Sequence, residues 1–162
     1  MSFEFTPMYG EIEEQNPHQV KSLLASSATK RLRYFYTEAA SEGELWGLCL
    51  DNHWASTQTS DGILAILLWP KAEYAQIYRN HSERTDLKNH RPGFIKRDYF
   101  LKFALPKLEQ NNLFAAVFFT PTDPGIILPP TDIKTAIEQL QMDWDGRVPS
   151  WSEGWMANAK EP

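Results

Sequence analysis

Apolar and polar positions along the chain follow a pattern that occurs twice. The first copy, residues 44–78, has an apolar strand (ELWGLCL), a polar bend, a second apolar strand (ILAILLW), Pro70 and a helical stretch (KAEYAQIY). The second copy, residues 113–141, repeats this order with LFAAVFF, the turn TPTDPG, IILP, two prolines and TDIKTAIEQLQ. Segments 63–69 and 113–119 are apolar on both faces, which is typical of central strands that are covered on two sides.

The doubled pattern predicts the α+β fold class. We expect about five strands in one antiparallel or mixed sheet, with helices mainly on one face, built from two strand–strand–proline–helix units. Pro70 should lie in the first turn of its helix, and Pro130 just before the second helix. We place a single domain at residues 16–142, between an acidic lead-in (residues 1–15) and a C-terminal tail (residues 143–162).

Capping residues and apolar stripes predict further helices. Asn16 followed by proline is a helix start, and Gly43 is a helix stop in the left-handed conformation. Between them, four residues follow the spacing of a stripe that faces the core: Leu32, Phe35, Tyr36 and Ala39. Arg31 lies off this stripe. Residues 79–95 are the least regular part of the chain, and a helix is expected after them.

That later helix covers roughly residues 96–110 and contains Pro106. Proline cannot donate to the carbonyl of Lys102, so we expect a kink or a break at this point.

Composition narrows the class of protein. The chain has 162 residues, of which 42% are hydrophobic and 23% charged, so a disordered chain is excluded and one domain is the simplest organisation. Its net charge of −5 argues against nucleic-acid binding driven by overall charge. The one cysteine, Cys49, cannot form an internal disulfide, and its apolar strand favours a small buried side chain. The N-terminus lacks the pattern of a secretory signal, and no apolar run is long enough to span a membrane; we expect a cytoplasmic protein.

Four segments, in order, resemble a known family: ATKRLRYFYTEAASEGELWGL, ILLWPKAEYAQIY, RDYFLKFALPKLEQNN, and LFAAVFFTP with GIILPP. Over roughly residues 20–141 they are similar to an uncharacterised bacterial family, domain of unknown function 2750. The resemblance implies a small α+β bacterial domain and brings no activity, cofactor or catalytic residue. The strand–proline–helix units also resemble, at the level of fold, proteins related to enhanced serine sensitivity protein B.

Candidate chemistry centres on the stretch from Arg79 to Arg97. It holds six basic residues against two acidic ones and would form an anion or phosphate site, or would pair with the acidic lead-in. The candidate anion-binding residues are Arg84, Lys88, His90 and Arg91, with His90 able to transfer a proton. The pair His81 and His90 has no common metal-ligand spacing, so an exposed loop explains it better than zinc. We find no cofactor motif and expect no cofactor.

Tryptophans are the other candidate feature. The tail carries Trp151 and Trp155, and large rings of this kind rarely stay in water, so we expect the tail to pack on the body or on a partner. Trp54 lies in a polar strand and is either an exposed interface residue or covered by the tail. Trp54, Trp151 and Trp155 are therefore the candidate interaction residues.

Two functions remain open. The first is a non-enzymatic protein-interaction module with a regulatory, accessory or immunity-type role, for which a partner protein is expected and a homodimer is one alternative. The second is a protein that binds a small anionic ligand or phosphate, including an enzyme, through residues 79–97. Nucleic-acid binding has weaker support, because Phe94 is the only aromatic residue in that basic stretch.

Overall fold

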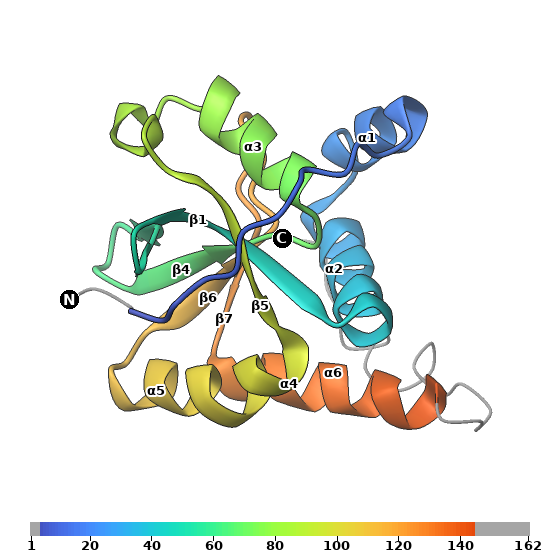
Figure 1. The fold of residues 1–162 in the computed structure, drawn as a ribbon, viewed down its shortest axis with the longest axis vertical. Helices are drawn as coiled ribbons and strands as arrows, with labels where there is room; N and C mark the ends of the chain where they lie inside the picture. Colours follow the sequence, from blue (N-terminus) through green and yellow to red (C-terminus); the bar gives the residue numbers. More distant parts are fainter. Residues whose placement is uncertain (1–3, 145–162) are drawn as a thin grey trace.

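The structure is a computed structural model that describes residues 4–144, and it confirms the α+β class (Figure 1). Its elements, in order, are α1 (Pro17–Leu24), α2 (Ala28–Glu42), β1 (Glu44–Leu50), β2 (His53–Trp54), β3 (Ser56–Gln58), β4 (Leu64–Leu68), α3 (Ala72–His81), the 3₁₀ helix η1 (Thr85–Leu87), β5 (Arg91–Lys96), α4 (Arg97–Tyr99), the π-helix η2 (Phe100–Ala104), α5 (Leu105–Gln110), β6 (Phe114–Val117), β7 (Ile126–Leu128) and α6 (Pro130–Trp144).

The described strands form two sheets, where the sequence predicted one sheet of about five strands. One sheet has the order β2-β1-β5 and the other β3-β4-β6-β7. They meet where Trp46 and Trp69 exchange two backbone hydrogen bonds of 3.0 and 2.7 Å. Figure 1 shows α1 and α3 at one end of the strands and α4, α5 and α6 at the other, with α2 along one side.

The doubled unit is present, with its two apolar strands at the centre of the four-stranded sheet. β4 and β6 pair in parallel, and β3 and β7 flank them. Each of the two prolines lies one or two residues away from the position that the sequence predicted. Pro70 precedes the capping residue Lys71 of α3, whereas Pro130 is itself the first residue of α6. Either place suits proline, because its missing N–H has no partner at a helix start.

The caps and the stripe of the first helices are confirmed. The Asn16 side chain accepts from the backbone N–H groups of His18 and Gln19, and Gly43 ends α2 with a φ of 75°. All four residues of the predicted stripe are buried in the core: Leu32, Phe35, Tyr36 and Ala39.

The expected break at Pro106 takes the form of a wider helical turn. The helix runs on from α4 through η2 to α5, and within η2 the N–H of Leu105 donates to the carbonyl of Phe100, five residues earlier. The inserted π-turn lies just before Pro106, where the wider turn accommodates the loss of the hydrogen bond that proline cannot donate.

Arg31 is the main surprise of the interior. It lies off the apolar stripe, yet it is 0% exposed. Its guanidinium donates to the carbonyls of Ser26, Phe118 and Pro124 and to the carboxylate of Asp123, with bonds of 2.5 to 3.0 Å. Arg31 thus ties α2 to the loop between β6 and β7, which the alternating pattern alone does not predict.

The N-terminal segment, residues 4–10, forms part of the fold. Met8 exchanges two hydrogen bonds of 2.8 Å with Phe94 on the outer edge of β5, and Glu4 bridges to His53 on β2. The segment covers Gly93 so closely that an added Cβ there would lie 3.0 Å from Pro7. An edge strand left open would invite pairing with other chains, and this segment protects β5 from it.

Candidate functional site

Trp54 is not on the surface. It is 4% exposed, and its indole N–H donates to the carbonyl of Phe5 over 2.8 Å. Its ring also lies against Gly47, where an added Cβ would come within 2.5 Å of Trp54 Cε3. Of the two alternatives, the exposed ring is therefore wrong, and within the described residues the N-terminal segment covers it. Trp151 and Trp155 lie outside the described residues.

The four candidate anion-binding residues do not meet in one place, and the stretch that holds them is not a loop. Arg84 forms a two-pronged ion pair with Asp86, with both bonds at 2.8 Å. Lys88 is exposed beside η1, and Arg91 begins β5, which pairs with β1. The sequence missed β5 because Pro92 and Gly93 interrupt its apolar pattern.

His90 is half-buried, and the charges of Asp86 and Arg84 act on its imidazole. Burial lowers the pKa of its imidazole, and Arg84 lowers it further against the opposing effect of Asp86. Its Nδ1 is buried and has no hydrogen-bond partner in the described part of the chain. The backbone carbonyl of His90 accepts from Arg79 over 3.0 Å, which anchors this residue to α3.

The structure instead presents an exposed aromatic cluster that the sequence did not single out. Tyr99 and Phe103 are each 48% exposed, and their ring centroids lie 4.8 Å apart. Phe5 meets Tyr99 edge to face at 6.0 Å. Lys102 lies over Phe103 and Lys107 over Phe5, at 5.5 and 5.4 Å. We call these five residues the α4 aromatic surface.

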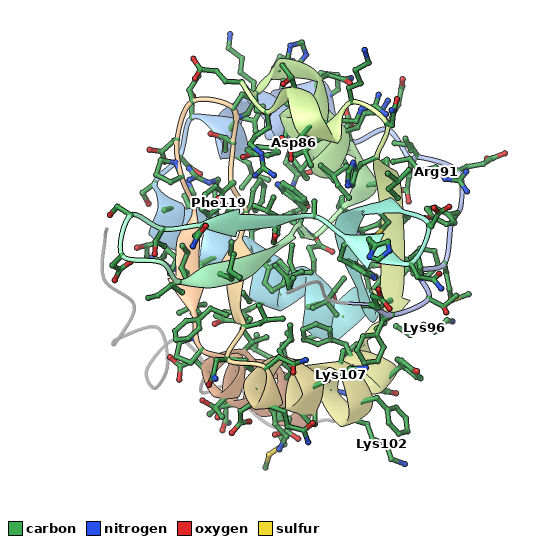
Figure 2. The ribbon with its side chains drawn as sticks, turned by 90° about the vertical axis from the view of Figure 1, so that its left-hand side faces the viewer. Asp86, Arg91, Lys96, Lys102, Lys107 and Phe119 are labelled. Atoms are coloured by element: carbon green, nitrogen blue, oxygen red, sulfur yellow. The ribbon has the colours of Figure 1, made fainter. Side chains whose placement is uncertain are left out.

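The α4 aromatic surface is also locally basic. Figure 2 shows Lys96, Lys102 and Lys107 towards the end of the molecule where α5 lies, while Arg91 and Asp86 lie towards the other end. Within residues 4–144, no carboxylate comes within 4.0 Å of the Lys102 or Lys107 ammonium group. The π-turn of η2 carries Phe103, and such turns often occur at functional sites.

From residue 4 onward, no carboxylate of the acidic lead-in forms an ion pair with a basic side chain of residues 79–97. Glu11 and Glu13 line a cavity of about 240 Å³ with two further carboxylates, Glu42 and Glu44, and with the neighbouring rings of Trp46 and Phe94. A second cavity, of about 350 Å³, lies between the N-terminal segment, the β1–β2 turn and the start of β5.

The described residues contain neither a candidate metal cluster nor a candidate membrane-spanning helix. Among positions 4–144, no group of three or more His, Cys, Asp and Glu side chains is placed to hold a metal ion. No helix in that range has both the length and the apolar character needed to cross a membrane.

Comparison with known proteins gives one match. The family model described as "Protein of unknown function (DUF2750)" matches residues 32–137. No curated protein and no solved structure matches the chain, so the likeness to proteins related to enhanced serine sensitivity protein B stays a prediction.

Proposed function

The chain belongs to the DUF2750 family, whose function is unknown, and we propose from its geometry that it is a protein-interaction module. It binds, on the α4 aromatic surface, a partner segment that carries acidic and aromatic side chains. The observation that carries this proposal is the pair of half-exposed rings of Tyr99 and Phe103, in contact and tilted by 45°, beside lysines that have no carboxylate partner in the described residues.

Large exposed rings suit this role because aromatic side chains dominate the binding energy of protein interfaces. Here Tyr99 is held between Phe103 and Phe5, so its ring loses little freedom when a partner packs on it. Lys102 and Lys107 each place the ammonium group over a neighbouring ring, at the border of the apolar area.

The charge around the rings selects the kind of partner. Lys102 and Lys107 have no carboxylate at ion-pair distance in the described residues, while the whole chain carries a net charge of −5. An acidic segment is therefore attracted to this surface and repelled by most of the rest, which favours one docking position.

The C-terminal tail, residues 143–162, is also part of the proposed interaction module. Trp151 and Trp155, with Glu153 between them, have the composition that the α4 aromatic surface would bind. We propose that residues 143–162 pack on the body or on a partner and that both tryptophans contribute to binding. The module would act in a bacterial cytoplasm, in a regulatory, accessory or immunity-type role. Trp54 is not among its anchors, because the N-terminal segment covers it.

Selection from a random peptide library displayed on phage tests the proposal. Selection on the full chain should enrich peptides that combine Asp or Glu with Trp, Phe or Tyr. The same selection on a Tyr99→Ser/Phe103→Ser variant should lose that enrichment, because the apolar area between the lysines is gone. Enrichment of basic peptides, or the same peptides on both proteins, would contradict the proposal.

A further inference from the structure

The cavity of about 350 Å³ lies apart from the α4 aromatic surface, at the other end of β5. Three segments build it: the N-terminal segment with Tyr9, the β1–β2 turn with Asp51 and Asn52, and the start of β5 with Asn89 and Arg91. Its size falls in the range of small-molecule sites, and its polar groups converge from segments far apart in the sequence.

Arg91 is fixed in this cavity by the ring beneath it. The guanidinium carbon lies 3.7 Å from the centroid of the Tyr9 ring, and the Tyr9 hydroxyl in turn donates to the carbonyl of Asp51 over 3.1 Å. At the backbone, Arg91 is paired with Cys49 on β1. Stacking occupies the flat face of a guanidinium and leaves its edge of N–H groups available.

The charge of Arg91 is not matched by a neighbour. Within residues 4–144, no carboxylate lies within 4.0 Å of its nitrogens, and the Asp51 carboxylate in the same cavity lies beyond that distance. A guanidinium that is stacked on a ring and has no carboxylate partner in the described residues matches the geometry of a planar carboxylate, to which it can donate two parallel hydrogen bonds.

We propose that this cavity binds a small carboxylate, held by the edge of Arg91, with the amides of Asn52 and Asn89 lining the site. Asp51 sets the preference among anions. The Asp51 carboxylate repels a second negative charge on a bound anion, so a phosphate dianion is held less favourably than a monoanionic carboxylate.

Cys49 contributes shape to this cavity rather than reactivity. It is buried, and burial raises the pKa of its thiol to about 12, although Arg91 opposes this. The thiol is therefore neutral at physiological pH and does not compete with the ligand for Arg91.

Binding is tested by titrating the full-length protein with acetate and benzoate, and with inorganic phosphate at the same ionic strength, followed by NMR of backbone amides and the Arg Nε–H group. We expect at least one carboxylate to shift the signals of Asn52, Asn89 and Arg91, and phosphate to bind about tenfold more weakly or not at all. No shift with any carboxylate, or equal binding of phosphate, would overturn the proposal.

Variants assign the binding to the cavity. Arg91→Gln should lower the affinity about tenfold or more, because it removes a charge-assisted bond. Lys88→Gln removes the same charge from the same stretch but outside the cavity, and it should leave the affinity within about twofold, as expected of an exposed charge. Asp51→Asn should strengthen phosphate binding. Equal losses in Arg91→Gln and Lys88→Gln would show a general charge effect and refute a site at Arg91.

Discussion

Replacing Arg31 by methionine should destabilise the protein strongly, although the residue lies outside the predicted core stripe. Met keeps the length of the side chain and deletes four hydrogen bonds, to Ser26, Phe118, Pro124 and Asp123. Pro124 and Asp123 are exposed and can bond to water instead, and the Asp123 side chain is 53% exposed. The carbonyls of Phe118 and Ser26 are less able to do so.

The magnitude follows from those two carbonyls. A hydrogen bond from a charged donor contributes about 1.5–3 kcal/mol, so their loss amounts to about 3–6 kcal/mol. Removing the guanidinium also removes the cost of burying its charge, which offsets part of the loss. We expect Arg31→Met to lower the free energy of unfolding by about 3 kcal/mol, which corresponds to a fall in Tm of about 6–12 °C for a chain of this length.

Urea denaturation followed by circular dichroism measures this change, and Arg33→Met is the matched control. Arg33 lies on the same helix and is half-buried, but its Nε has no hydrogen-bond partner in the described structure. Its replacement should cost under about 1 kcal/mol. Equal costs for the two variants would refute the argument that the bonds of Arg31 hold the loop between β6 and β7.

Two further predictions concern the β1 strand. Gly47→Ala should destabilise the fold by about 1–3 kcal/mol, because the added Cβ would lie 2.5 Å from the buried Trp54 ring. Gly10→Ala, whose added Cβ would lie 3.9 Å from the Phe94 ring, should be close to neutral in thermal melts. Folding raises the pKa of the Cys49 thiol, so the unfolded chain releases the thiol proton at a lower pH than the folded chain does. The free energy of unfolding should therefore be unchanged below about pH 9 and should fall by about 1.4 kcal/mol by pH 10. The urea midpoint of the wild type should fall from pH 8 to 10, and that of Cys49→Ala should fall less steeply. Equal slopes in the two proteins would contradict the assignment of this pH dependence to the Cys49 thiol.

Local signals predicted local structure well. The cap at Asn16, the stop at Gly43 and the apolar stripe of α2 depend on neighbours within a few residues, so the sequence reveals them. The central strands β4 and β6 were equally clear, because both faces of each are apolar.

Long-range contacts were hidden from the same reasoning. Arg31 looks like a surface residue until its acceptors at Phe118 and Asp123, about ninety positions away, are brought next to it. Trp54 looks exposed because its strand is polar. Its cover comes from Phe5, which lies 49 positions earlier in the chain. These long-range contacts leave no periodic pattern of apolar and polar residues in the sequence, so the sequence does not reveal them.

The candidate sites were only partly predictable for the same reason. Arg91 was singled out from its charge, but the Tyr9 ring that fixes it lies on a segment described from the sequence only as acidic and polar. Tyr99 and Phe103 lie in the helix predicted over residues 96–110, and the structure leaves both half exposed. Composition identifies aromatic and basic residues, but only the fold shows which of them remain on the surface together.

The most direct test of the proposed function is the affinity of one selected acidic, aromatic peptide for three proteins, measured by fluorescence anisotropy. The Tyr99→Ser/Phe103→Ser variant should bind about 30-fold more weakly than the wild type, which corresponds to the roughly 2 kcal/mol typical of a lost aromatic anchor. Ile12→Ser, which removes another exposed apolar side chain, should bind as the wild type does. Unchanged affinity in the double variant, with its fold intact by circular dichroism, would contradict the α4 aromatic surface as the binding site.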